Sequence, residues 1–427
     1  MSEQHTLAAA DVAVAFRTLG CKVNRVESDS IAAELLGRGA RVVGEDEAAV
    51  VVINTCTVTA EADVKARKAV RQALRAMRAP VVVVTGCLAA VDAPALSALG
   101  ERVVVESDKE RVALRVAGLL GLDVDPQSHV KARTRAGEGF RTRAMLKIED
   151  GCDNFCTYCI VPRARGVPRA VTLGEAVAEA GGLVAAGTRE IVLTGINIGR
   201  YRDLATGADL ADLIGAVART GIERLRLSSI EPPDLTKRLL AVLASTPAVC
   251  EHIHVPLQSG SDAVLSAMGR AYTTAEFAER IAAARGAIPG LAVTTDLIAG
   301  FPGETDDQHA ETVAFVERMD FAKLHVFRYS VRPGTLAASM AQVAPEVRSL
   351  RAAELRALGD QASERHVASR SGEMAEVLVE RVAGPVASGT TRDYLKVAFP
   401  ATPETKVGDV VTVAVSPAGT PGPERGH

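Results

Sequence analysis

The chain has 427 residues, 48% hydrophobic and 24% charged, which excludes a disordered or fibrous protein and predicts about three domains. Lys and Arg number 49 against 52 Asp and Glu, which excludes a generally basic nucleic-acid coat, so any contact with RNA must be local. The sequence has neither a run of about eighteen apolar residues nor a signal peptide, which predicts a cytoplasmic protein without a membrane partner.

Apolar strands alternate with helical patterns in residues 12–122, which predicts an α/β domain with a parallel, flavodoxin-like sheet. Its cysteines, Cys21, Cys56 and Cys87, each follow the end of a strand. Because the carboxyl ends of parallel strands share one edge, where ligands bind in such sheets, we expect the three thiols to converge. The alternative is three buried apolar cysteines. The expected strands are 12–17, 50–54 and 81–85, and the expected helices are 27–36 and 61–77.

A polar, basic stretch at 123–143 is typical of a linker. The alternation of strands and helices then restarts and predicts a partial or complete βα barrel over residues 144–369. After this barrel, apolar residues recur with a period of two, which predicts a small C-terminal β-barrel or sandwich at 370–417. The last residues, 418–427, are expected to form a disordered tail. The expected barrel strands are 144–148, 190–194, 224–228, 252–256, 292–298 and 323–327.

Three further cysteines form a Cys-x-x-x-Cys-x-x-Cys run after the first barrel strand, at Cys152, Cys156 and Cys159. A four-iron cluster normally takes four thiolates, so three close thiols leave one iron open to a small molecule. The alternative is a zinc knuckle, although zinc sites usually repeat a Cys-x-x-Cys pair or add histidines at fixed spacing. The seventh cysteine, Cys250, is expected to be buried, and the odd total without an export signal disfavours disulfides.

The Cys152–Cys159 run at the start of a βα barrel resembles the radical S-adenosylmethionine (SAM) superfamily. The resemblance implies that these three cysteines bind a [4Fe–4S] cluster whose open iron chelates SAM and yields a 5′-deoxyadenosyl radical. It places Tyr158 beside the adenine, although packing at a strand end is an alternative role for this ring. Weaker matches at strand ends, which are also typical of tight turns, imply SAM contacts by Thr194, Gly195, Asn197, Ser228, Glu231, Ile298 and Gly300.

A radical SAM barrel preceded by such an α/β domain resembles the methylthiotransferases. In that family the three N-terminal cysteines, here Cys21, Cys56 and Cys87, are the metal ligands of a second [4Fe–4S] cluster. The segments Val255–Ser261 and Ala299–Glu304 also fit the family. The C-terminal β-domain resembles the TRAM module, which is associated with RNA binding, although it is short and poor in basic residues.

The motif Thr18–Asn24 (TLGCKVN) resembles the branch that acts on threonylcarbamoyladenosine at position 37 of tRNA, with Arg25 replacing the usual Gln. The resemblance implies tRNA, through its anticodon loop, as partner, and an electron donor such as flavodoxin or ferredoxin. The sulfur donor stays open. Alternatives are a methylthiotransferase for isopentenyladenosine or for a ribosomal-protein aspartate, and a non-catalytic iron–sulfur protein that binds RNA or senses redox state.

Basic residues in two places are candidates for contacts with RNA phosphates. The alternative for such a run is a solvated helix face. The residues are Lys65, Arg67, Lys68, Arg71, Arg75 and Arg78 in the second helix, and Arg163, Arg165 and Arg169 after the cysteine run.

Overall fold

The structure is a computed structural model that describes residues 12–125 and 142–416. The expected tail and most of the expected linker lie outside the described residues. The chain divides into two compact units, of which the first holds the residues up to 125 together with Gly151–Pro168 and Ser330–Thr335, and the second holds the rest. No helix in the described ranges is long and apolar enough to cross a membrane.

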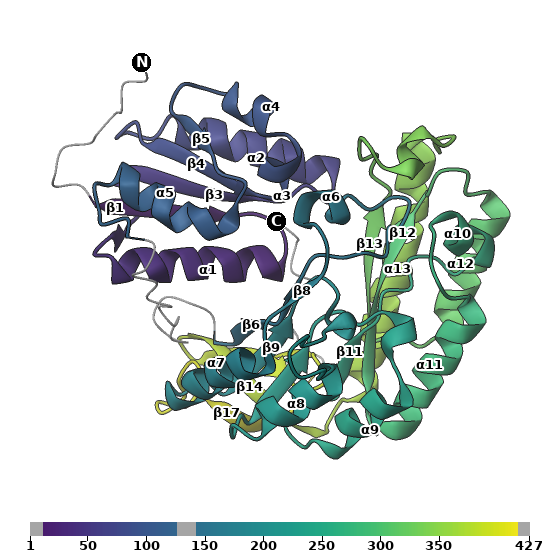
Figure 1. Ribbon diagram of the computed structural model, residues 1–427. Coiled ribbons are helices and arrows are strands. Elements are labelled where there is room, and N and C mark those ends of the chain that lie inside the picture. Colours follow the sequence, from purple (N-terminus) through teal and green to yellow (C-terminus); the bar gives the residue numbers. More distant parts are fainter. Residues whose placement is uncertain (1–11, 126–141, 417–427) are drawn as a thin grey trace. The chain divides into compact units, whose positions relative to one another are not determined.

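The first unit contains a five-stranded parallel sheet with the order β2-β1-β3-β4-β5 (Figure 1). Residues 50–55 of its central strand are all buried, as expected for a strand covered by helices on both faces. This strand order confirms the flavodoxin-like prediction. The strands are β1 (Ala13–Thr18), β2 (Arg41–Val42), β3 (Val50–Thr55), β4 (Val81–Gly86) and β5 (Val103–Val105).

Helices cover both faces of this sheet because alternate strand residues point to opposite sides. One core packs Val50 and Val52 against α1 (Lys22–Gly37) and α5 (Val112–Leu119). The other packs Val51 and Ile53 against a second set of helices. These are α2 (Ala60–Ala73), α3 (Cys87–Val91) and α4 (Ala93–Ser97). A 3₁₀ turn, η1 (Lys109–Arg111), leads into α5, and α6 (Val161–Arg165) also belongs to this unit.

The second unit contains the predicted partial βα barrel. Two three-stranded parallel sheets, β10-β9-β6 and β11-β12-β13, are joined by parallel bridges from Leu225 to Val249 and from Ser229 to His254. Six strands therefore follow one another around a single core. They are β6 (Ala144–Lys147), β9 (Glu190–Thr194), β10 (Arg224–Leu227), β11 (His252–His254), β12 (Ala292–Ala299) and β13 (Lys323–Arg328).

The barrel helices begin where the sequence supplies caps. Capping boxes start α7, α8, α11 and α12, for example Thr172 with Glu175. The helices are α7 (Leu173–Ala185), α8 (Leu210–Ala218), α9 (Lys237–Ser245), α10 (Asp262–Ala267), α11 (Thr274–Ala287), α12 (Asp306–Arg318) and α13 (Pro345–Ser369). Short elements connect them: β7 (Glu149–Asp150) pairs with β8 (Arg169–Ala170), and η2 (Ile198–Arg200), η3 (Pro232–Asp234) and η4 (Leu336–Ser339) are 3₁₀ turns.

The C-terminal β-domain is a four-stranded antiparallel sheet with the order β16-β15-β14-β17. Arg224 and Arg226, from β10, both pair with the buried Glu190 at the start of β9 and donate to the carbonyls of Thr390 and Thr391, at 3.0 Å each. The sheet therefore packs against the amino ends of the barrel strands. Its strands are β14 (Met374–Ala383), β15 (Val386–Thr391), β16 (Lys396–Pro400) and β17 (Val410–Ala414).

Candidate active site

The three N-terminal cysteines lie at the same edge of the five-stranded sheet. Cys21 precedes α1 and is exposed, Cys56 follows β3 and is buried, and Cys87 is the first residue of α3 and is buried. Burial raises the pKa of the Cys56 thiol to about 11, and repulsion from Cys87 and Cys21 adds to this rise. The three thiols therefore act on one another electrostatically. All seven cysteines are free.

Two glycines allow the cysteine loops to approach each other. Gly20 has φ of 100°, and a Cβ there would lie 2.5 Å from the Cβ of Cys56. Gly86 has φ of 91°, and a Cβ there would lie 2.4 Å from the carbonyl oxygen of Thr55. No larger residue fits either position, because real Cβ contacts are never so short. This is the physical reason for the Gly-Cys pairs in the first and third cysteine motifs.

Asn24 fastens the loops together. Its Nδ2 donates to the carbonyl oxygens of Leu19, at 2.8 Å, and Thr55, at 2.9 Å, and the side chain is buried. Asn54 in turn donates to the carbonyl oxygen of Asn24 at 2.9 Å. The first two cysteine motifs are thus joined by hydrogen bonds from their own asparagines.

Arg165, which the sequence placed among candidate surface cations, is buried inside the first unit. Its side chain is only 1% exposed, pairs with Glu27 at 2.9 Å and donates to Oδ1 of Asn24 at 2.5 Å. Lys109 reaches the same oxygen of Glu27 at 2.8 Å. Both interpretations of Arg165, as a phosphate contact and as part of a solvated face, are therefore wrong, whereas Arg163 and Arg169 are exposed.

The loop with Cys152, Cys156 and Cys159 groups with the first unit. All three cysteines are half-buried. The backbone N–H of Cys152 donates a hydrogen bond to the carbonyl oxygen of Gly166 at 3.1 Å, which closes the loop. Tyr158 is also half-buried. In the two ranges that the structure describes, no three His, Cys, Asp or Glu side chains lie close enough to share one metal ion.

In the second unit, a carboxylate that the sequence analysis missed holds the predicted strand-end turn after β9. Oε2 of Glu149 accepts hydrogen bonds from the backbone N–H groups of Ile196, at 2.9 Å, and Asn197, at 2.8 Å. Burial raises the pKa of Glu149 to about 7. Gly195 is needed here because a Cβ would come within 2.9 Å of the carbonyl oxygen and Oε2 of Glu149.

Several polar atoms at these strand ends are buried without a hydrogen-bond partner among the described residues. They are Oδ1 and Nδ2 of Asn197, Oγ of Ser228 and Oε1 of Glu149. Asn197 is 4% and Ser228 6% exposed, so water reaches neither freely. Buried polar groups are rarely left unpaired, and those that are usually belong to a ligand site. Thr194 is also buried at the end of β9.

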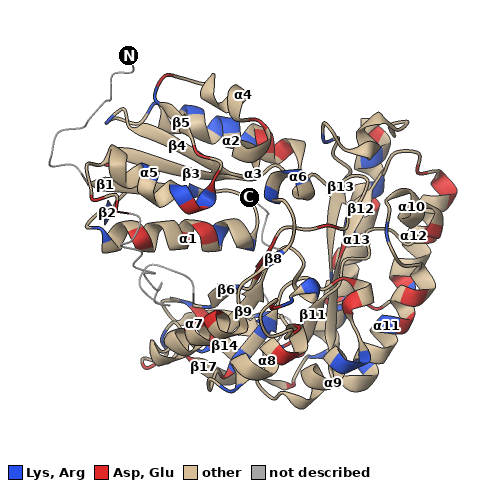
Figure 2. Ribbon diagram, in the orientation of Figure 1, with Lys and Arg blue, Asp and Glu red and all other residues tan. Residues whose placement is uncertain are grey.

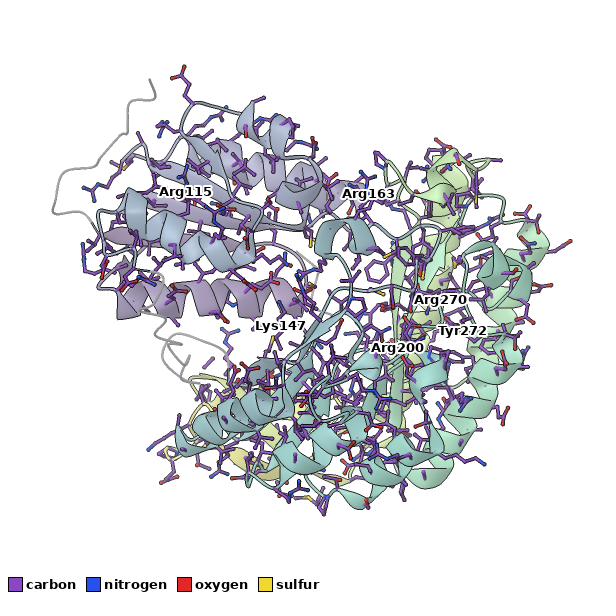
Figure 3. The ribbon with its side chains drawn as sticks, viewed as in Figure 1. Arg115, Lys147, Arg163, Arg200, Arg270 and Tyr272 are labelled. Carbon is purple, nitrogen blue, oxygen red and sulfur yellow. The ribbon has the colours of Figure 1, made fainter. Side chains whose placement is uncertain are left out.

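The other predicted SAM contacts have partners within the unit. Glu231 forms an ion pair with Arg270, whose guanidinium lies 5.0 Å above the ring of Tyr272 (Figure 3). Burial still raises the pKa of Glu231 above its usual range. Ile298 is half-buried, and Gly300 has φ of 72° with no room for a Cβ beside Arg348.

Two histidines and the seventh cysteine lie on and just before β11. His252 and His254 both hydrogen-bond to Oγ1 of Thr294, at 3.0 Å and 2.9 Å. Cys250 is buried, and burial raises the pKa of its thiol.

Two family models match the chain: the Radical SAM superfamily over residues 146–316, and the family described as Uncharacterized protein family UPF0004 over residues 13–105. A Bacillus subtilis protein named threonylcarbamoyladenosine tRNA methylthiotransferase MtaB is 39% identical over 96% of this chain and 94% of its own. An Acidothermus cellulolyticus protein named tRNA-2-methylthio-N(6)-dimethylallyladenosine synthase is 38% identical over 94% of this chain and 85% of its own.

Among solved structures, the radical SAM methyltransferase TsrM from Kitasatospora setae superposes with a TM-score of 0.58. The match covers 77% of each chain at 16% identity. At this identity the likeness concerns the fold alone.

Proposed function

The chain belongs to the tRNA methylthiotransferase family of radical SAM enzymes, and from this premise we propose that it converts N6-threonylcarbamoyladenosine at position 37 of tRNA to its 2-methylthio derivative. The substrate is favoured by the relative with this activity in its name, which aligns over almost the whole chain. The observation that carries the reaction type is the presence of two separate cysteine trios, one at a sheet edge and one in the loop before the barrel helices.

We assign one [4Fe–4S] cluster to each trio. Cys21, Cys56 and Cys87 fit a cluster because the donor set consists of thiols alone and glycines keep the surrounding backbone close. Cys152, Cys156 and Cys159 are assigned to the other cluster by their spacing. When bound, the clusters and SAM supply the electron, the radical that takes hydrogen from the adenine C2, and the sulfur and methyl group that replace it.

The unpaired polar atoms at the strand ends fit SAM. The amide of Asn197 can donate to a carboxylate and accept from an amine, and the hydroxyl of Ser228 can do either. Glu149 contributes indirectly because its Oε2 fixes the backbone that carries Asn197. We propose Thr194, Gly195, Asn197, Ser228, Glu231, Ile298 and Gly300 as the SAM contacts of the barrel, with Tyr158 in the loop.

For the tRNA we propose a docking surface on α2. Figure 2 shows Lys and Arg gathered on this helix. Lys65, Lys68 and Arg71 on the helix and Arg75 just beyond it are exposed, and none forms an ion pair with another described residue. Their charges are therefore available to phosphates.

We propose that the anticodon loop enters the site and that an electron donor of the flavodoxin or ferredoxin kind supplies electrons.

The second candidate substrate is the dimethylallyl form of adenosine at the same position. It is favoured by the relatives named tRNA-2-methylthio-N(6)-dimethylallyladenosine synthase, which are 36–38% identical. Both candidates share the chemistry at C2 and differ in the group on N6.

Mass spectrometry of tRNA nucleosides from cells lacking this chain separates the candidates. The proposal expects the 2-methylthio form of threonylcarbamoyladenosine to disappear, its precursor to accumulate, and the wild-type gene to restore it. If the methylthio form of dimethylallyladenosine (isopentenyladenosine) disappears instead, that nucleoside is the substrate. Loss of neither would overturn the proposed function.

Replacing Lys65, Lys68, Arg71 and Arg75 by Gln tests the docking surface. We expect weaker tRNA binding and a binding constant that depends less on salt, by roughly 0.7–0.9 in the log–log slope for each phosphate that the variant no longer neutralises. Replacement of the exposed Arg356 and Arg365 on α13 is the control and should leave the slope unchanged. An unchanged slope in the α2 variant would rule out this surface.

A further inference from the structure

Arg165 connects the chain that follows the second cysteine trio with the edge that carries the first trio. It is the last residue of α6, shortly after Cys159, and its guanidinium contacts Asn24 and Glu27 on α1, the helix that begins after Cys21. All of these residues belong to the first unit. The side chain is 1% exposed, so its charge is shielded from solvent.

Two cations meet at one carboxylate beside the cysteine edge. Arg165 and Lys109 bind the same oxygen of Glu27, at 2.9 Å and 2.8 Å. The guanidinium of Arg165 therefore brings a buried positive charge to this edge. Charges buried in a protein act more strongly than charges in water because the surroundings screen them less.

This positive charge lies beside the cysteine loops. Oδ1 of Asn24, which accepts a hydrogen bond from Arg165 at 2.5 Å, also accepts one from Sγ of Cys21 at 3.7 Å. Helix α6, which ends at Arg165, packs against α3, whose first residue is Cys87. A cation beside thiolates favours additional negative charge on anything those thiolates bind.

We propose that Arg165 is a positioning residue that holds a positive charge beside the Cys21–Cys56–Cys87 cluster and raises its reduction potential. The inference rests on the proposed function only in assigning a cluster to these cysteines. Adding one electron makes the cluster more negative, and a nearby cation stabilises that state.

The test uses the full-length chain with Cys152, Cys156 and Cys159 replaced by Ala, so that only the N-terminal cluster is left. Reconstituted protein is titrated with a reductant while the reduced cluster is followed by electron paramagnetic resonance. We expect Arg165→Gln to shift the midpoint potential to a more negative value and Arg165→Lys to restore it largely. Arg163→Gln, which removes an exposed arginine from the same helix, is the matched control and should leave the potential unchanged.

A second variant covers the case in which Arg165→Gln does not fold. Glu27→Gln removes the shared anion with little change of shape, and it should shift the potential in the positive direction. Unchanged potentials in the folded variants would overturn the inference, as would equal shifts in Arg163→Gln. If the triple-alanine background takes up no iron where about four atoms are expected, the assignment of the cluster fails as well, which separates the two proposals.

Discussion

The cysteine edge of the first unit and the strand ends of the barrel occupy the same place in their sheets, beyond the carboxyl ends of parallel strands. They differ in how one buried asparagine amide is paired. At the cysteine edge, the amide of Asn24 pairs with two carbonyls and with Arg165. At the barrel edge, the amide of Asn197 is equally buried but has no partner among the described residues.

The two amides therefore have different consequences. The paired amide of Asn24 holds two cysteine loops together, although Oδ1 of Asn54 and Oγ1 of Thr85 at the same edge have no partner among the described residues. An unsatisfied buried group costs about 1–3 kcal/mol, and a ligand that pairs with it recovers that free energy on binding. We infer that Asn24 serves the structure of the first edge, whereas Asn197 is placed to pair with a ligand at the second.

The largest effects are expected from removing one cysteine of each trio. Cys156→Ala should abolish formation of 5′-deoxyadenosine, because SAM loses its metal. Cys56→Ala should spare that cleavage and abolish the methylthio product. Each variant should take up about four irons where the wild type takes up about eight. The reverse pattern in a 5′-deoxyadenosine assay would exchange the roles of the two cysteine trios.

Gly86→Ala, at the tight cysteine edge, should lower stability more than the same substitution at an open position. A Cβ at Gly86 would lie 2.4 Å from a backbone oxygen, so the free energy of unfolding should fall by at least about 3 kcal/mol. Gly39 has a similar φ of 94° but open space around it, and Gly39→Ala should cost only about 1–2 kcal/mol. If chemical denaturation gave the two variants equal losses of unfolding free energy, the backbone conformation and not the close contact would determine the loss.

Glu149 makes the barrel edge sensitive to pH. Its pKa is raised from 4.5 to about 7, so the folded state keeps a proton that the unfolded state has already released. Stability from this group is fully present below pH 4.5 and falls as the pH rises to about 7, by up to about 3 kcal/mol. Chemical denaturation across this range should show a shallower decline for Glu149→Gln than for the wild type. Parallel curves would contradict the burial argument.

The elements with a clear period could be predicted from the sequence. β9 begins and ends at the predicted residues, and the six barrel strands and three cysteine loops follow from repeated strand patterns. Short strands such as β2 and β5 carry too few residues to show a period. The long helix α13 was missed because its buried residues are separated by charged ones on most of its surface.

Side chains that depend on tertiary contacts could not be predicted. Arg163, Arg165 and Arg169 look alike in the sequence, yet only Arg165 is buried, because α6 places it against Glu27. Glu149 gives no signal beyond one acidic residue after a strand. The roles of the six cysteines as cluster ligands stay predictions.

The smallest effect, and the most direct test of the contrast between the edges, comes from Asn197→Ala. The variant loses two buried atoms that have no partner among the described residues, so the unfolding free energy of the ligand-free chain should stay unchanged or rise. SAM affinity, measured by equilibrium binding, should weaken about tenfold for the loss of a hydrogen bond of about 1.4 kcal/mol. Asn24→Ala, which removes a fully paired amide at the cysteine edge, should instead lose about 1–3 kcal/mol of stability. If Asn197→Ala destabilises the free chain as much as Asn24→Ala does, its amide has a structural partner and the barrel edge is not a site held open for a ligand.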